Sequence, residues 1–256
     1  MGSVALVGAG PGDPELLTIR GANRLRAADL VLYDALAPEA LLALAPQARR
    51  FYVGKRAGRH SIDQEGIHKL MIRAARRGER VVRLKCGDPF VLGRGGEECL
   101  ALEEAGVPYE VVPGLSSAIA APALAGIPVT HRGMAPGFAI ASGHAAEAYG
   151  PVVDGIAPGV LTLVVLMGLR TRGAIAERLI ARGWSPETPA AIVMGASQPT
   201  EARWLGTLAT LATAVIDLEL PGVLVIGEVV ALAPTIGARA DLHAAAPTQQ
   251  GLRGLP

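Results

Sequence analysis

Short apolar runs that are typical of β-strands alternate along the chain with helix-like segments. In the first part of the chain the predicted strands are residues 4–7, 30–33, 50–53, 81–84 and 109–112, and the predicted helices are residues 14–27, 38–43, 64–77 and 95–105. Asp13, Pro14 and Glu15 suit the start of the first helix, because a capping side chain, an early proline and a negative charge all favour a helix N-terminus. The alternation predicts an α/β fold with parallel strands and crossover helices.

The composition of the sequence changes after Pro113, and an alanine-rich helix is predicted over residues 116–125. Beyond it the predicted strands are residues 137–141, 160–167, 190–194 and 222–230, and the predicted helices are residues 174–182 and 207–211. We therefore expect two α/β domains, residues 1–115 and 116–238, with a cleft between them. Residues 239–256 show no periodicity and are expected to form a flexible tail.

Hydropathy does not predict a membrane span. Half of the 256 residues are hydrophobic, but the longest strongly apolar run, residues 159–169, has eleven residues, whereas a spanning helix needs about 18 or more. No basic segment precedes an apolar core at the N-terminus, as it would in a secretory signal. We expect a cytoplasmic protein with no membrane partner.

Charge is unevenly distributed although the whole chain carries only +1. Residues 49–94 contain thirteen Lys or Arg against four Asp or Glu, a net charge of +9, which leaves −8 for the remainder. Because neither an overall basic domain nor a nucleic-acid reading motif is present, an anionic small molecule is the expected partner, and nucleic acid is not. Part of this charge, at Arg73, Arg76, Arg77 and Arg80, has the spacing of a solvated helix face.

Cysteine and histidine do not indicate a metal centre. Cys86 and Cys99 form no CxxC motif, and the five histidines are scattered along the chain. The sequence therefore predicts neither a bound metal nor a disulfide framework.

Three turns rich in small residues follow predicted strands: GAGPGDP at residues 8–14, CGDPFVLGRGG at residues 86–96 and PGLSSA at residues 113–118. Open α/β sheets bind ligands at the carboxyl ends of their strands, so the three turns predict one shared site. The first turn begins like a dinucleotide fingerprint, but Asp13 stands where the third glycine belongs, and Pro11 and Pro14 disturb the entry to the helix. An NAD-dependent oxidoreductase is therefore a weak alternative.

These turns, together with VGKRAGRHSIDQ at residues 53–64 and GIPVTHR at residues 126–132, closely resemble the uroporphyrinogen-III C-methyltransferases of the tetrapyrrole methyltransferase family. The resemblance runs from residue 4 to about residue 233. It implies two α/β domains that enclose S-adenosylmethionine, a homodimer, and methylation of uroporphyrinogen III at C2 and C7 to give precorrin-2 for sirohaem or cobalamin synthesis. No metal is needed for that transfer.

The resemblance also implies a set of residues that contact the cofactor, drawn from both halves of the chain. They are Pro11, Cys86, Gly87, Asp88, Val91, Ser116, Ser117, Met167 and Ala196. Glycine allows backbone groups to approach a ligand closely, Asp88 offers a charge opposite to that of the sulfonium, and Met167 offers a soft apolar wall. Ordinary core packing is the alternative interpretation of Met167.

For catalysis the resemblance points to Asp34 as a proton acceptor and Lys55 as a proton donor. Alternatively, Asp34 caps the following helix and Lys55 only binds substrate carboxylates. Arg94, in the GRGG turn, is a third candidate, with a salt bridge to Glu97 or Glu98 as its alternative role.

Arg132 is expected to bind substrate carboxylates, unless it lies in a solvated loop. His131 and His144 are weaker candidates for ligand contacts, because a lone histidine is more often structural.

Three positions depart from the family pattern. Cys86 stands where glycine is usual, and Leu92 and Leu166 replace aromatic residues. The thiol of Cys86 either crowds the cofactor or is turned away from it. Two alternative functions stay open: methylation of a later corrinoid precursor, and binding of a tetrapyrrole or cofactor without turnover.

Overall fold

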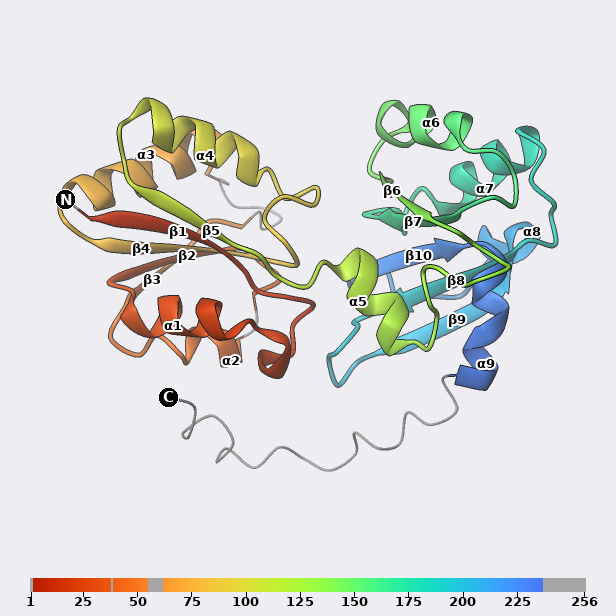
Figure 1. Ribbon diagram of the computed structural model, residues 1–256, viewed down its shortest axis with the longest axis horizontal. Coiled ribbons are helices and arrows are strands. Elements are labelled where there is room, and N and C mark those ends of the chain that lie inside the picture. Colours follow the sequence, from red (N-terminus) through yellow and green to blue (C-terminus); the bar gives the residue numbers. More distant parts are fainter. Residues whose placement is uncertain (1, 38, 55–61, 237–256) are drawn as a thin grey trace.

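The protein folds into two halves, each built on its own five-stranded sheet (Figure 1). The structure is a computed structural model that describes residues 2–37, 39–54 and 62–236. Within them, the fold class is α/β, as the alternation of predicted elements indicates. No helix among the described residues combines the length and apolar character that a membrane crossing requires.

The first sheet is parallel throughout, with the strand order β3-β2-β4-β1-β5. Its strands are β1 (Ser3–Gly8), β2 (Leu30–Tyr33), β3 (Arg49–Tyr52), β4 (Arg80–Lys85) and β5 (Tyr109–Val112). The helical elements beside it are η1 (Pro14–Leu16), α1 (Ile19–Ala27), α2 (Glu39–Leu42), α3 (Gln64–Arg76) and α4 (Gly95–Glu104).

Helices cover both faces of this sheet, with α3 and α4 on one side and α1 and α2 on the other (Figure 1). Leu6 of β1 and Leu32 of β2 pack against α3 and α4. Their neighbours in sequence, such as Val7 and Val31, face α1 and α2. Burial of both faces explains why β1 and β2 are continuous apolar runs without polar alternation.

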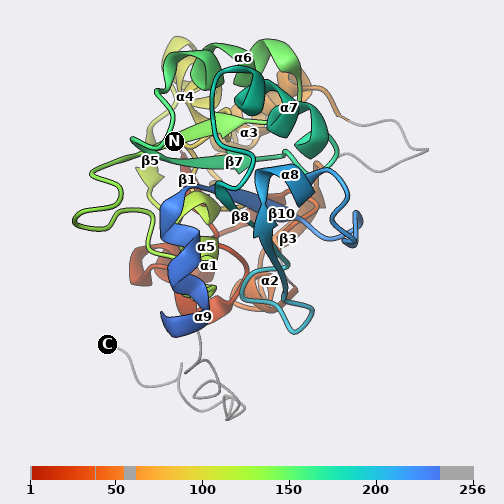
Figure 2. The same ribbon diagram turned by 90° about the vertical axis from the view of Figure 1, so that its right-hand side faces the viewer.

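The second sheet has the strand order β6-β7-β10-β8-β9. Its strands are β6 (Phe138–Ser142), β7 (Thr162–Leu166), β8 (Pro189–Met194), β9 (Ala202–Thr207) and β10 (Gly222–Ile226). Its helical elements are α5 (Ser117–Leu124), α6 (Ala146–Gly155), α7 (Arg172–Ala181), α8 (Leu208–Leu211), η2 (Glu228–Leu232) and α9 (Ala233–Ile236). The elements α6, α7 and α8 cover one face, and α5, η2 and α9 cover the other (Figures 1 and 2).

The second sheet is mixed, which corrects the expectation of parallel strands for this half. β6 and β7 are parallel, but β10 is antiparallel to both β7 and β8, and β9 is antiparallel to β8. The departure arises because β8 and β9 form a hairpin and β10 inserts between β7 and β8. The sequence pattern did not predict strand β9 or helix α6.

Two predicted elements differ in extent from those of the structure. The helix expected over residues 14–27 is divided, because Leu17 and Thr18 have extended backbones. Asp13 accordingly caps only η1, and Thr18 caps α1 by accepting a hydrogen bond from the backbone N–H of Gly21 at 3.1 Å. The strand expected over residues 222–230 ends at Ile226, because the positive φ of Gly227 (143°) turns the chain into η2.

Helix α5 packs on the second sheet, where Ala118 and Ala121 join a buried cluster with Val164 and Val225. This packing is consistent with a domain boundary near residue 115, although the division into residues 1–115 and 116–238 stays a prediction. Residues 239–256, for which a tail is predicted, lie outside the described residues.

A matched pair of leucines on α4 tests the packing of the first half. Leu102 is 0% exposed, whereas Leu100 is 73% exposed. We expect Leu102→Ala to lower the free energy of unfolding by about 2–5 kcal/mol, because it leaves a cavity beneath the sheet. Leu100→Ala, as the control, should change it by less than about 0.5 kcal/mol. Urea denaturation measures both, and equal losses would contradict the assignment of the buried face.

Candidate functional site

The three small-residue turns meet at the carboxyl edge of the first sheet. Gly10 and Gly87 form an antiparallel bridge in which each N–H donates to the carbonyl oxygen of the other, at 3.2 Å and 2.9 Å. The third turn joins them through Asp88, whose Oδ2 accepts a hydrogen bond from Gly114 N at 3.0 Å. The structure thus brings together turns that are about 75 and 25 residues apart in the sequence.

The approach of these turns excludes side chains at residue 8. A β-carbon there would lie 2.5 Å from Gly114 N and 2.6 Å from Gly87 O, both backbone atoms that cannot easily move. Gly87 has a second reason to be glycine, since its φ is +65°. The close packing of backbone on backbone therefore depends on glycine at these positions.

The first turn also contacts the second half of the chain. The backbone N–H of Asp13 donates to Ser197 Oγ at 3.0 Å, and a β-carbon on Gly12 would lie 1.9 Å from Gln198 Nε2. These contacts bring Pro11 into a turn that neighbours the turn containing Ala196. Predicted cofactor residues from both halves of the chain therefore lie in adjoining turns.

Met167 lies at the end of β7, on the same edge of the second sheet as the turn after β8, because both strands are antiparallel to β10. Its side chain is 54% exposed, so core packing, the alternative interpretation, does not account for it.

Backbone strain is concentrated in these turns. Among the described residues, those other than glycine with a left-handed φ are Leu92 (53°), Arg94 (59°), Met167 (59°) and Ser197 (66°). Such a conformation costs an L-residue about 1 kcal/mol or more, and strained residues cluster at functional sites. Leu92 and Arg94 belong to the second turn, and Ser197 belongs to the turn that contacts the first.

The backbone conformation at residue 86 does not require glycine, because Cys86 is not among the described residues with positive φ. Its half-buried Sγ lies 3.9 Å from the carbonyl oxygen of Gly10, so the thiol faces the first turn. Burial, with a smaller effect of the Asp34 charge, raises the pKa of this thiol to about 11. The side chain is therefore a neutral thiol near pH 7.

Two other predicted cofactor residues stabilise the turns themselves. Asp88 Oδ1 accepts a hydrogen bond from Phe90 N at 2.8 Å, in addition to the bond from Gly114 N, so Asp88 ties the second turn to the third. Ser116 is buried and caps α5, where its Oγ accepts from Ala118 N at 3.3 Å. Ser117 is the first residue of α5, and Val91 is half-buried in the second turn.

Asp34 follows β2 and forms an ion pair with Arg83 of β4. Arg83 Nη2 lies 2.8 Å and 2.9 Å from the two carboxylate oxygens, whose side chain is 33% exposed. The carboxylate is therefore fixed by Arg83 on its buried side and accessible to solvent on the other. The alternative role of Asp34 is to cap the following helix, which begins at Glu39 in the structure, five residues after Asp34.

A buried group of charges lies behind Asp34, and the sequence analysis missed it. Glu98 of α4 pairs with two cations: its Oε1 lies 3.0 Å from Arg83 Nε, and its Oε2 lies 2.9 Å from Lys85 Nζ. Burial, followed by repulsion from Arg83, lowers the pKa of Lys85. The sequence does contain a signal for this buried group. Side chains alternate along a strand, so Arg83 and Lys85 share a face of β4 with Val81, which is a buried core residue.

Of the other predicted catalytic and substrate residues, Arg94 belongs to the second turn, whereas Arg132 lies in none of the three turns. Arg94 makes two hydrogen bonds to Glu97, at 2.9 Å and 2.7 Å, which is one of the salt bridges considered as its alternative role. Lys55 lies outside the described residues. His144 Nδ1 is 2.8 Å from Ser142 Oγ at the end of β6.

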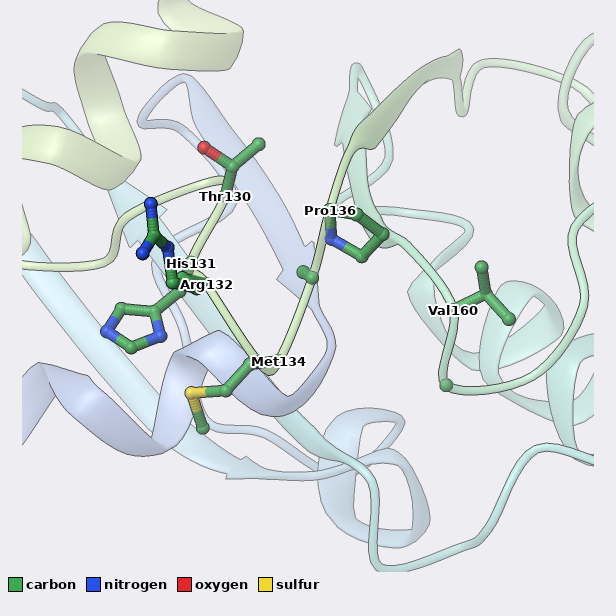
Figure 3. Close-up of a pocket in the computed structure, with 9 residues that line it drawn as sticks. Thr130, His131, Arg132, Met134, Pro136 and Val160 are labelled. Atoms are coloured by element: carbon green, nitrogen blue, oxygen red, sulfur yellow. The ribbon is translucent and has the colours of Figure 1, made fainter.

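Arg132 and His131 lie in the loop between α5 and β6, where both are exposed. They line a surface depression of about 630 Å³ that residues 130–136 form with Gly159 and Val160 (Figure 3). None of the predicted cofactor residues lines this depression. A role of Arg132 at the site of the three turns stays a prediction.

The arrangement resembles known proteins in sequence and in structure. Residues 3–212 match the family of tetrapyrrole (corrin/porphyrin) methylases. The chain is 47% identical over 234 residues to a uroporphyrinogen-III C-methyltransferase of Methanocaldococcus jannaschii, which covers 90% of this chain and 97% of that protein. A siroheme synthase of Neisseria meningitidis serogroup B is also 47% identical over 234 residues, covering 90% of this chain and 48% of that protein. This chain thus spans about half the length of the curated siroheme synthases that it matches.

Among solved structures, the uroporphyrin-III C-methyltransferase of Thermus thermophilus, crystallised with S-adenosyl homocysteine, is similar with a TM-score of 0.78. It is 46% identical, and the match covers 90% of this chain and all of that chain. Since the family match spans well over half of the residues, and a relative of nearly the same extent is 47% identical, this chain belongs to the tetrapyrrole (corrin/porphyrin) methylases.

Proposed function

We propose that this chain methylates uroporphyrinogen III at C2 and C7, with S-adenosylmethionine as the methyl donor, and gives precorrin-2. The observation that carries the proposal is the meeting of the three turns with the turn around Ser197, in a chain 46% identical to a methyltransferase crystallised with S-adenosyl homocysteine. A relative that bears this activity in its name matches over 97% of its length.

The residues present fit S-adenosylmethionine. At Gly87 a β-carbon would meet Ser117 N at 3.5 Å and Ser116 Cα at 3.7 Å, so glycine leaves space beside the start of α5. A helix N-terminus favours a carboxylate such as that of the methionine moiety. Pro11, Val91, Met167 and Ala196 would supply the apolar walls, and Cys86 adds no charge. When bound, S-adenosylmethionine supplies a methyl group on a positively charged sulfur.

The tetrapyrrole substrate has an apolar macrocycle and eight carboxylates, and the surface around the turns offers both kinds of contact. Leu36, Phe90 and Leu92 are 51%, 59% and 45% exposed. Leu36 follows Asp34 closely, and the other two belong to the second turn, so they suit the flat ring. Arg94, in the second turn, has an exposed guanidinium group that suits carboxylates. We propose the same role for the exposed Arg132, which lies in the loop between α5 and β6.

The chain's acid–base chemistry is assigned to Asp34. After methylation, a proton must leave the macrocycle for charge neutrality to return, and a positioned carboxylate accelerates such a transfer by about 100-fold or more. Asp34 is open on one side and fixed by Arg83 on the other. Lys55 as proton donor and Arg94 as a substitute for Asp34 remain part of the proposal. So do the cytoplasmic location and the homodimer.

The first test is anaerobic incubation of the protein with uroporphyrinogen III and S-adenosylmethionine labelled in the methyl group. We expect mass analysis of the tetrapyrrole to show two added methyl groups. Methylation of only a later corrinoid precursor would replace the substrate assignment. Cofactor binding by calorimetry without any methyl transfer would indicate a binding protein instead.

Substitution of Asp34 tests its role as proton acceptor. We expect Asp34→Asn, which keeps the shape of the side chain, to lower kcat about 100-fold, because the amide accepts no proton. The dissociation constant of S-adenosyl homocysteine should stay unchanged in calorimetry. Asp217→Asn, at an exposed position in the second half, is the control. Full activity of Asp34→Asn together with inactivity of Arg94→Ala would move the role to Arg94.

Gly8→Ala tests whether the packing of the turns forms the cofactor site. Its β-carbon would collide with the backbones of Gly114 and Gly87 and displace the turns. We therefore expect the affinity for the cofactor to fall at least about tenfold, which corresponds to a loss of roughly 1.4 kcal/mol of binding free energy. Gly155→Ala is the matched control, because nothing lies within 4 Å of a β-carbon there. Calorimetry with S-adenosyl homocysteine measures both, and unchanged affinity of a folded Gly8→Ala protein would contradict the assignment.

A further inference from the structure

The proposed chemistry does not use the buried Glu98, although this residue belongs to the group of charges behind Asp34. We propose that Glu98 is a positioning residue: it fixes the guanidinium of Arg83, which in turn orients the carboxylate of Asp34 for proton transfer. This inference rests on the proposed function, because it assigns Asp34 the role of proton acceptor.

The guanidinium of Arg83 has a partner on every nitrogen. Its Nε donates to Glu98 Oε1 at 3.0 Å, and its Nη1 donates to the carbonyl oxygen of Leu84 at 3.2 Å. Its Nη2 donates to both oxygens of Asp34, at 2.8 Å and 2.9 Å. Because the guanidinium is planar and rigid, fixing Nε on one side determines where Nη2 points on the other. Glu98 thus acts on Asp34 through one rigid plane.

Glu98 is itself held in place. Its side chain is 0% exposed, and Lys85 Nζ lies 2.9 Å from Oε2. Gln64, at the start of α3, donates from Nε2 to Oε1 at 3.1 Å. Contacts from α3 and β4 therefore restrict the carboxylate, and with it the acceptor that Arg83 uses.

This group contains as many carboxylates as cations. Arg83 and Lys85 are two cations, each 3% exposed, and Glu98 and Asp34 are the two carboxylates that face them. Without Glu98, Asp34 would be the remaining anion for two buried cations and would be drawn toward them. Buried ion pairs often stabilise a fold no more than apolar residues of similar volume do. The burial of three charges, those of Arg83, Lys85 and Glu98, is therefore better explained by orientation than by stability.

The test compares two double variants of equal charge, Lys85→Met/Glu98→Gln and Lys85→Met/Glu98→Leu. Both remove one cation and one anion and leave Arg83 paired with Asp34, so neither buries an unbalanced charge. Glutamine keeps an oxygen that accepts from Arg83 Nε, whereas leucine does not. We expect the leucine variant to have a kcat about tenfold lower than the glutamine variant, part of the roughly 100-fold that a positioned acid or base supplies. The KM of uroporphyrinogen III and the affinity for S-adenosyl homocysteine should be alike in both.

Repeating the pair in the Asp34→Asn background shows whether Glu98 acts through Asp34. There the difference between glutamine and leucine at position 98 should vanish, and its persistence would overturn the inference. Equal kcat values of the two variants in the original background, with both proteins folded by thermal denaturation, would overturn it as well. Activity of the unaltered protein, measured alongside, decides the proposed function separately, because its absence overturns both proposals.

Discussion

The site depends on the approach of three backbone turns at the carboxyl edge of the first sheet. Gly8, Gly87 and Gly114 come so close that their backbones pack directly on one another, which positions the ends of β1, β4 and β5 as one surface. Asp88 reinforces this surface by accepting backbone hydrogen bonds from two of the turns. A candidate cofactor site built from backbone is rigid, because backbone groups have no rotamers to order when a ligand binds.

The second half is connected to this surface through the turn after β8. Asp13 and Ser197 join the first turn to the turn after β8, and Ser197 has the left-handed backbone seen also at Met167 and Arg94. Strain of this kind persists only where the surrounding structure enforces it. The mixed second sheet makes the arrangement possible, because β10 inserts between β7 and β8 and leaves their carboxyl ends on one edge.

Beneath the turns, electrostatics and packing are combined in one group of residues. Asp34 is accessible, but Arg83, Lys85 and Glu98 behind it are buried. The same helix, α4, carries Glu98 toward this group and Glu97 toward the exposed Arg94. Its first turn thus influences two of the candidate catalytic residues, one from inside the protein and one from its surface.

The sequence by itself determined the α/β class, the positions of the first five strands and the three turns, because apolar runs and glycine are local signals of strands and of special backbone conformations. Long motifs also indicated the family. Only the tertiary structure decided that Thr18 begins a new helix, that β10 runs antiparallel, that Met167 is exposed, and that Arg83 and Glu98 lie behind Asp34. The direction of β10 and the group behind Asp34 arise from pairing between residues distant in sequence, such as Arg83 with Asp34 at a separation of 49 residues, which no local pattern encodes.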